Sequence, residues 1–510
     1  MAESFWWPVA PPLLGGAVLS LLIEQRLEPR PALPWKRPLS AAAIHAGLWL
    51  FLFAGVLAVF RRPFFAAGIV LACMLLVVLV SNAKRHSLRE PFVFQDFEYF
   101  ADALRHPRLY LPFLGVSRAL TAVLAFVLAW YAGIVVERSL TTRTSMEEFL
   151  TGTIILAAAG AGLLWLGARG KTRVAFEPDT DLRNLGLTAC LWRYAAEESN
   201  EPFIASIYDC ATPDRLSSGE RPHLVVVQSE SFFDARRLFA GIRPEVLTHY
   251  DALRASSVCN GRLEVSAWGA NTVRTEFAFL SGLAPQALGV HRFNPYRKLA
   301  RKNVPTLASY LKCLGYRTIC VHPYPASFYA RDSVYPLLGF DEFIDIRGFD
   351  GAESAGPYVG DRAVAEKVCA LLEAAAEGPI FVFVITMENH GPLHLEKALP
   401  DDAQRFYSSP PPGAWDALTV YLRHLRNADR MAGMLRERLQ ELPGTGWLCW
   451  FGDHVPILPA VYEETGFADG RTDYVVWGKE QTIRGNAARD LRVEELGGVL
   501  LEEVGLLPKA

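Results

Sequence analysis

The 510-residue chain lacks several features that would assign it to a common class. Its net charge is −3, so there is no basic excess of the kind that favours nucleic acid. None of its eight cysteines belongs to a Cys-x-x-Cys pair, which argues against a zinc ribbon and a thioredoxin-type redox site. The sequence contains no Gly-x-Gly-x-x-Gly or Gly-x-x-x-x-Gly-Lys-Ser/Thr phosphate loop and no internal repeat.

The cysteines are scattered, and buried free thiols are the default interpretation for those in apolar runs, namely Cys73, Cys320 and Cys449. If the domain that carries them faces an oxidising compartment, one disulfide is possible among four of the other cysteines. These candidates are Cys190, Cys210, Cys259 and Cys313.

Long apolar runs dominate the first 170 residues, whereas the remainder has the composition of an ordinary soluble domain. Five runs approach the 20 or so apolar residues that a membrane helix needs. They are Trp6–Ile23, Ser40–Phe60, Phe64–Ser81, Pro112–Val136 and Phe149–Ala168. We therefore expect a helical transmembrane bundle at 1–170, a linker with a connecting helix at 171–214, and an α/β domain at 215–510.

Helical and strand-like segments alternate from about residue 180 onward, which favours a mainly parallel sheet covered by helices on both faces. Helices are predicted at Pro305–Leu314, Arg362–Ala376 and Ala414–Leu442, and a late strand at Asp473–Trp477. Pro305 would occupy the first helical position, which proline favours.

Four short apolar runs end in side chains that can do chemistry, and such runs are typical of buried strands. Residues 224–227 lead to Glu230, 318–321 to His322, 380–385 to His390, and 447–451 to Asp453 and His454. Open α/β sheets bind ligands at the carboxyl ends of their strands. We therefore expect these side chains to line one catalytic rim.

Thr272 is the candidate nucleophile, because small residues precede it and the helix-like run 277–280 follows. A hydroxyl at a helix N-terminus lies where a developing anion or a bound phosphate is favoured. An ordinary N-cap is the alternative for this threonine taken alone. With Glu230, Asp453 and His454 it completes three oxygens and one imidazole for one divalent metal, which would lower the hydroxyl pKa. Mn²⁺ is favoured, with Zn²⁺ and Mg²⁺ as alternatives.

These residues stand in ordered motifs that resemble one known family. The motifs are Glu230-Ser231, Asn271-Thr272 with Thr275-Glu276-Phe277, Phe328-Tyr329-Ala330-Arg331-Asp332, Asn389-His390 and Gly452-Asp453-His454. They resemble the lipoteichoic acid synthase and phosphoglycerol transferase family of the alkaline phosphatase/sulfatase superfamily. The match covers about residues 215–480, and that family also carries a preceding block of about five membrane helices.

The resemblance implies a role for each matched residue. The metal ligands would be Glu230, Thr272, Asp453 and His454, and Thr272 would be the threonine that becomes covalently modified. Arg331 and His390 match residues that hold the phosphoglycerol group, and Tyr329 stands where relatives often carry tryptophan. His322 and His394 are secondary candidates. No [CS]xPxR motif surrounds Thr272, which counts against a formylglycine-dependent sulfate ester hydrolase.

The function that these expectations favour is transfer of phosphoglycerol from phosphatidylglycerol to a cell-envelope glycan through a phospho-threonine intermediate. A phosphoethanolamine transferase, a phosphodiester hydrolase and a catalytically silent membrane-anchored binding protein are the alternatives. Lys and Arg cluster after the first, third and fifth spans, which by itself would place the α/β domain in the cytoplasm. The resemblance and an envelope acceptor instead predict a multi-pass protein of the cytoplasmic (inner) membrane with its catalytic domain outside.

Overall fold

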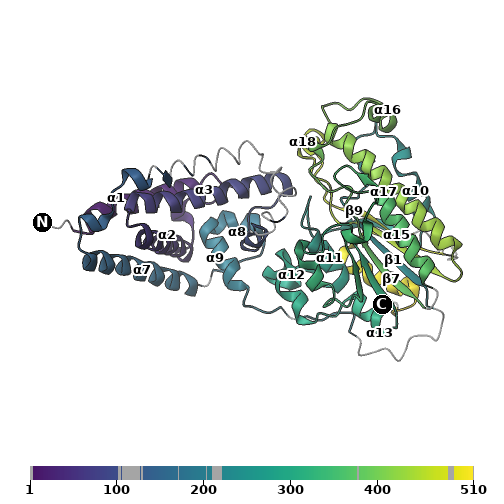
Figure 1. Cartoon of the computed structure of the whole chain (residues 1–510), viewed down its shortest axis with the longest axis horizontal. Helices are drawn as coiled ribbons and strands as arrows, with labels where there is room; N and C mark the ends of the chain where they lie inside the picture. The colour runs from purple at the N-terminus through teal and green to yellow at the C-terminus, as the bar shows by residue number, and fades with distance from the viewer. Residues whose placement is uncertain are drawn as a thin grey trace. The chain divides into compact units, whose positions relative to one another are not determined.

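A computed structural model describes residues 4–508 except 101–104, 106–123, 125–126, 128–129, 132, 171, 203, 210–220, 376–377 and 480–486. The chain divides into two compact units, Met1–Glu201 and Pro202–Ala510. They are called the N-terminal unit and the C-terminal unit below (Figure 1).

Four helices of the N-terminal unit, among the residues described, are long and apolar enough to cross a membrane. They are α1 (Trp6–Glu24), α2 (Leu39–Phe60), α3 (Pro63–Leu88) and α7 (Met146–Arg169). Two shorter helices follow, α8 (Pro178–Leu185) and α9 (Leu187–Glu197). The four long helices confirm four of the expected spans and indicate a membrane protein. The remaining expected span, 112–136, falls mostly outside the described residues.

Glycines allow α2 and α7 to pack backbone against backbone. A Cβ atom on Gly47 would lie 2.7 Å from the backbone nitrogen of Leu164, and one on Gly160 would lie 2.7 Å from that of Phe51. Small residues at helix crossings are a common means of close packing in membranes, where water supplies no hydrophobic force between helices. The apolar helices are therefore packed as a bundle.

The C-terminal unit is built on one nine-stranded sheet (Figure 1). Its strands are β1 (His223–Ser229), β2 (Cys259–Glu264), β3 (Arg317–Val321), β4 (Glu342–Ile344), β7 (Ile380–Ile385), β8 (Gly446–Gly452), β9 (Thr472–Gly478), β10 (Ala487–Ala488) and β11 (Leu491–Arg492). The order is β10-β2-β9-β8-β1-β7-β3-β4, with β11 also paired to β2. Only the β8–β9 and β9–β2 pairings are antiparallel within this described sheet, which confirms the mainly parallel architecture.

Helices cover both faces of the sheet, as expected for buried parallel strands. One face packs against α10 (Thr248–Ala255), α15 (Asp361–Ala374) and α17 (Asp416–Glu441), and the other against α11 (Thr272–Ser281), α13 (Leu307–Cys313) and α19 (Val493–Val504). Shorter elements complete the described unit: α12 (Pro295–Lys298), α14 (Arg331–Val334), α16 (Asp402–Phe406), α18 (Pro459–Thr465) and a hairpin of β5 (Ser354–Ala355) and β6 (Tyr358–Val359). All ten residues of α11 are buried.

Two sequence expectations need correction. The helix expected from Pro305 begins at Leu307, because Thr306 Oγ1 accepts a hydrogen bond from the Ser309 N–H at 3.1 Å and caps it. Cys73 is a free thiol but is exposed on α3, whereas the free thiols of the two strand cysteines are buried. Of the candidates for a disulfide, Cys190 and Cys259 are free, and Cys313 is disulfide-bonded.

Candidate functional site

Glu230, Asp453 and His454 meet at the carboxyl ends of β1 and β8, which are neighbours in the sheet. The Nε2 atom of His454 lies 3.6 Å from Glu230 Oε1 and 3.4 Å from Asp453 Oδ2. All three side chains are buried, and one ligand atom from each lies within 4.8 Å of the others. One ion could therefore contact all three residues.

The charges of this group call for a cation. Burial and the charge of Asp453 raise the pKa of Glu230 to about 8. Asp453 Oδ2 is buried and accepts no hydrogen bond from the described residues. The Nδ1 atom of His454 lies 3.2 Å from the carbonyl oxygen of Val455, which can only accept, so Nδ1 carries the proton. Nε2 then presents its lone pair to the carboxylates, and this donor set fits a divalent metal.

The local backbone explains how these side chains converge. A Cβ atom on Gly452 would lie 1.8 Å from the carbonyl oxygen of Phe232, so only glycine allows the end of β8 to approach this loop. Ser231 has a φ of 54°, in the left-handed region, and its N–H donates to Asp453 Oδ1 at 2.8 Å. The hydroxyl of Tyr421 on α17 donates to the Ser231 carbonyl at 2.7 Å. The loop after β1 is thus fixed from both sides.

Thr272 is the first residue of α11, and Asn271 occupies the N-cap position with a left-handed φ of 65°. The N-cap alternative for Thr272 is therefore wrong. One turn further on, the Thr275 hydroxyl donates to the Asp453 carbonyl at 2.9 Å. Residues three apart share one side of a helix, so Thr272 lies on the same side of α11 as the Thr275 hydroxyl that contacts Asp453. Its hydroxyl is also at the electropositive end of the helix.

Arg331 is held inside the C-terminal unit by Glu276 of α11. Its Nη2 lies 2.8 Å from Glu276 Oε2 and its Nε lies 3.3 Å from Oε1, and both residues are buried. The hydroxyls of Tyr296 and Tyr335 also donate to Glu276 Oε1. Glu276 thus occupies the Nε and Nη2 side of the guanidinium and leaves Nη1 for a different partner.

His322 lies beside that remaining nitrogen, with its Nε2 atom 3.3 Å from Arg331 Nη1. Its Nδ1 donates to the Ile385 carbonyl at 3.1 Å, so Nε2 accepts from the guanidinium. Burial and the charge of Arg331 lower the pKa of His322 well below its usual value. The ring is therefore neutral and fixes the orientation of the guanidinium.

His390 follows β7 and keeps one nitrogen free for chemistry. Its Nδ1 donates to the Gly391 carbonyl at 2.7 Å, which leaves Nε2 as an acceptor. Burial lowers the pKa of His390, so its ring is neutral at pH 7. The ring of Tyr329 lies over the Arg331 guanidinium at 5.2 Å. His394, the other secondary candidate, is exposed.

A buried acidic network adjoins the loop that carries His390. Glu388 Oε2 accepts from the Asp361 N–H at 2.7 Å, and Oε1 accepts from Asn427 Nδ2 at 2.6 Å and from His424 Nδ1 at 2.8 Å. Burial lowers the pKa of His424, but its hydrogen bonds to Glu388 and Glu396 outweigh burial and raise it to about 9. A protonated imidazole between two carboxylates thus anchors the start of this loop to α17.

Sequence reasoning missed the partners of the named residues. Glu276 stood in a quoted motif without a role, and His424 was one polar residue in a long predicted helix. A charged side chain in an otherwise apolar helical run, such as 277–280 after Glu276, signals a buried partner, because an unpaired buried charge is too costly. That signal gives no indication that the partner of Glu276 is Arg331.

Comparisons with known proteins agree with this architecture. A family model described as Sulfatase matches residues 222–494. The chain is 29% identical, over 83% of its length and 79% of the relative's, to the capsular polysaccharide biosynthesis protein RkpI of Rhizobium meliloti (strain 1021).

Two solved structures are also similar. The integral membrane protein lipooligosaccharide phosphoethanolamine transferase A (EptA) from Neisseria meningitidis is 14% identical, covers 91% of this chain and 87% of its own, and has a TM-score of 0.56. The Streptococcus pyogenes phosphoglycerol transferase GacH, in complex with sn-glycerol-1-phosphate, is 22% identical, covers 61% of this chain and 79% of its own, and has a TM-score of 0.47. The likeness to EptA shows that the chain shares a fold with it across both units. The family match spans more than half of the chain, and the chain belongs to the sulfatase family.

Proposed function

We propose that this protein is a membrane-bound, metal-dependent transferase that moves phosphoglycerol from phosphatidylglycerol to a cell-envelope glycan. The observation that carries the proposal is Thr272 at the start of α11, on the side facing the buried group Glu230, Asp453 and His454. A hydroxyl at a helix N-terminus beside a site for a cation would suit transfer of a phosphate diester. Residues 215–510 would form the catalytic domain.

The phosphoglycerol donor is favoured over phosphatidylethanolamine by the contacts of two side chains. An ammonium headgroup prefers a carboxylate or an aromatic face, and Glu388 and Tyr329 are the candidates nearest in sequence to the matched motifs. The carboxylate of Glu388 already accepts hydrogen bonds from Asp361, His424 and Asn427. The ring of Tyr329 already lies over Arg331. A neutral glycerol needs neither group.

In the first step, the Thr272 oxygen attacks the phosphorus of the donor and the bond from phosphorus to the diacylglycerol oxygen breaks. Thr272 loses one proton and the departing diacylglycerol gains one, so the step is balanced. A bound divalent ion, with Mn²⁺ as our choice, would lower the pKa of the threonine hydroxyl and offset phosphate charge. Arg331 Nη1 stabilises a phosphate oxygen, and Glu276 with His322 keep it in place.

In the second step, a glycan hydroxyl attacks the phosphorus of the phospho-threonine and releases Thr272. The neutral Nε2 of His390 accepts the proton of that hydroxyl. The bond from phosphorus to the Thr272 oxygen breaks and this proton passes to that oxygen, so the threonine hydroxyl and the neutral ring are both restored. An acceptor in the cell envelope requires a catalytic domain outside the inner membrane. The disulfide of Cys313 supports that side, since disulfides persist in oxidising compartments. The name of the relative RkpI, which refers to capsular polysaccharide biosynthesis, supports a glycan acceptor.

The test uses the purified full-length protein with labelled phosphatidylglycerol or phosphatidylethanolamine in detergent micelles. We expect release of diacylglycerol from phosphatidylglycerol and an added phosphoglycerol mass on the peptide that contains Thr272. Thr272→Ala should lose at least a hundredfold in release rate, roughly 2.7 kcal/mol in barrier. Thr272→Ser is the matched control, because it retains a hydroxyl at the same place.

Faster cleavage of phosphatidylethanolamine would overturn the donor assignment and leave the threonine chemistry standing. Release by Thr272→Ala at a rate within about tenfold of wild type, roughly 1.4 kcal/mol, would overturn the nucleophile. If the product of the assay is free glycerol phosphate, and no glycerol phosphate is attached to a glycan in cells, the enzyme is a hydrolase.

A further inference from the structure

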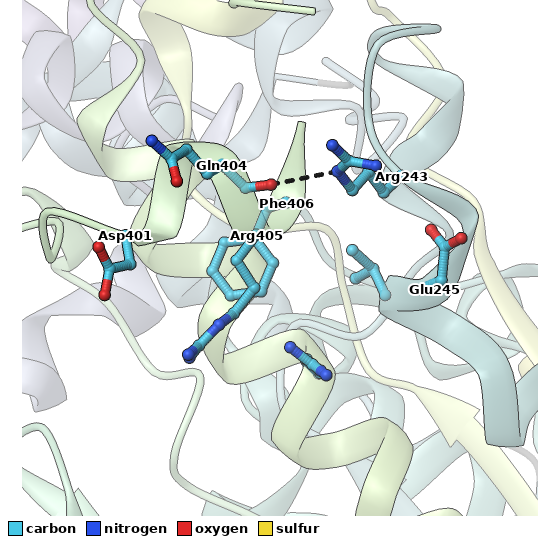
Figure 2. A pocket seen from close by; sticks show the side chains of 8 residues that line it. Arg243, Glu245, Asp401, Gln404, Arg405 and Phe406 are labelled. Carbon is cyan, nitrogen blue, oxygen red and sulfur yellow. Dashed lines mark hydrogen bonds between the residues drawn. The ribbon is translucent and has the colours of Figure 1, made fainter. Parts of the chain in front are cut away.

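A pocket of about 500 Å³ lies on the C-terminal unit, between the segment that precedes α10 and the helices α16 and α17. Its volume is within the range of small-ligand sites. Three arginines line it, Arg243, Arg405 and Arg426, together with the acids Glu245 and Asp401. Figure 2 shows Arg243 and Arg405 on separate segments of the wall, joined through the Arg243 Nε hydrogen bond to the Gln404 carbonyl.

The three guanidinium groups form no ion pair with an acidic side chain among the residues that the structure describes. Among the described residues, the Arg243 side chain donates through Nε, to the carbonyls of Gln404 and Tyr407 at 3.2 and 2.9 Å. By contrast, Arg423 on the same helix as Arg426 pairs with both Glu396 and Asp402. The pocket therefore keeps its positive charges available.

Mutual repulsion supports the same interpretation. Burial, and the charges of Arg430 and Arg405, lower the pKa of Arg426. The charge of Asp429 opposes this effect in part, and an anion bound among the arginines would relieve the repulsion that remains. Guanidinium groups suit carboxylates and phosphates, because their planar forks match two oxygens at once.

The acids in the lining distinguish between kinds of anion. Glu245 and Asp401 form no ion pair within the described chain, so their carboxylates remain as hydrogen-bond acceptors. They would repel a uniformly anionic lipid surface or a run of acidic peptide side chains. A sugar chain that alternates carboxylates with hydroxyl groups would satisfy both the arginines and the acids.

The helix α17 contributes both to the pocket and to the edge of the sheet that carries Glu230, Asp453 and His454, called the reactive edge below. The buried side of this helix contacts that edge through Tyr421 and His424. Arg426 lies about 7.5 Å further along the axis than Tyr421, on the opposite side of a helix about 10 Å across. A polymer of several sugars would be needed to extend from the pocket to this edge.

We propose that this arginine pocket binds an acidic sugar of the glycan that the enzyme modifies, so that the acceptor is a carboxylate-bearing polysaccharide. The proposal rests on the proposed function, because it concerns the acceptor of that reaction. The pocket holds the polymer and takes no part in cleaving the lipid.

Calorimetry on the purified full-length protein tests binding, with tetragalacturonate as the acidic probe and maltotetraose as the neutral one. We expect tetragalacturonate to bind, more weakly as salt screens the charges, and maltotetraose not to bind. Arg405→Gln with Arg426→Gln should weaken binding by about tenfold or more, because charge-assisted hydrogen bonds are lost. Arg317→Gln with Arg362→Gln removes the same charge from exposed ion pairs elsewhere and should leave binding unchanged.

Equal affinity of the two double variants, equal binding of both sugars, or no binding of tetragalacturonate would overturn the proposal. So would an arginine-dependent affinity for phosphatidylglycerol vesicles or hexaglutamate that exceeds the affinity for tetragalacturonate. Thermal unfolding of both variants checks that they fold alike. Release of diacylglycerol without acceptor should be unchanged in Arg405→Gln/Arg426→Gln. If the wild-type protein releases no diacylglycerol, the proposed function is wrong. The binding experiment still tests, independently, whether the pocket binds an acidic sugar.

Discussion

Each unit buries an arginine against a glutamate, and the N-terminal pair joins backbone segments. Arg37 pairs with Glu24 at the end of α1 and donates from Nε to the Ala32 carbonyl at 2.7 Å. Glu24 also accepts from the N–H of Thr188 on α9 at 3.3 Å, and His45 of α2 lies 3.7 Å from it. The pair thus connects α1, the turn before α2, and α9.

The C-terminal pair of Arg331 and Glu276 has different surroundings. Two tyrosine hydroxyls donate to Glu276, whereas Nη1 of Arg331 contacts the neutral His322 among the described residues. A buried ion pair is weak evidence of stability, because desolvation offsets the attraction. The comparison teaches that the other contacts of the pair, and not its burial, distinguish a structural link from a charge held ready for a ligand.

The largest expected difference between the pairs is in turnover. Arg331→Met with Glu276→Gln should lower the rate of diacylglycerol release about 1,000-fold, as when a donor to the developing charge is removed. Arg37→Met with Glu24→Gln makes the same chemical change in the N-terminal unit and should alter that rate by less than about threefold. The rate of diacylglycerol release, divided by the amount of folded protein, checks this prediction. An equal loss of rate in both double variants would show that the two pairs do not differ in function.

Single substitutions should instead affect both units alike. Glu276→Gln and Glu24→Gln each leave a buried guanidinium without its counter-charge, which costs about 3 kcal/mol or more. Hydrogen exchange should report faster opening of α11 in the first variant and of α1 in the second. Faster exchange in both units for either variant would show that the pairs are not independent.

High pH should weaken α17 in the C-terminal unit, because the His424 imidazole on that helix is held in its protonated form between two carboxylates. Its folded pKa of about 9 exceeds the ordinary histidine value of 6.5, so its stabilisation is complete below pH 6.5 and is lost as pH rises through 9. The loss is roughly 3 kcal/mol. Hydrogen exchange of α17 across this range checks it, with α7, which contains no histidine, as internal control. The dependence of α17 stability on pH should disappear in His424→Gln. A dependence that persists in this variant would assign the effect to another group.

The smallest effects should come from single hydroxyls beside each pair. Tyr335→Phe removes a donor to Glu276, and Ser20→Ala removes the hydroxyl 2.9 Å from His45 Nε2. Each should cost about 1 kcal/mol, the net contribution of one hydrogen bond. Thermal unfolding measures both. Only Tyr335→Phe should also lower turnover, by a few-fold, because Glu276 orients Arg331; no change in turnover would separate the two roles.

Local patterns were enough to predict the strands and the side chains at their ends. The run 447–451 followed by Asp453 and His454 is readable because apolar length and a polar end lie in one short segment. The parallel sheet followed from the alternation of elements, and four of the five spans from hydropathy alone. These properties depend on neighbours in sequence.

Pairings between distant segments could not be predicted in this way. Glu276 and Arg331 are 55 residues apart, and nothing in either segment specifies the other. The arginine pocket joins three segments whose charges look like ordinary solvated side chains in sequence. The antiparallel position of β9 between β8 and β2 likewise depends on tertiary packing. Such contacts are decided when the sheet assembles.

The central place of β1 in the sheet also governs when the reactive edge can exist during synthesis. Leu224 of β1 pairs with Phe381 on one side and Trp447 on the other, so neither neighbour is available until long after β1 has been made. Closing such long loops is entropically unfavourable, and chains dominated by distant contacts fold slowly. Glu230 and Thr272 therefore cannot form a site until β8, which precedes Asp453 and His454, has been synthesised and has paired with β1. A nascent or truncated chain that ends before β8 carries no assembled site, and the edge that would perform the chemistry is among the last parts of the protein to form.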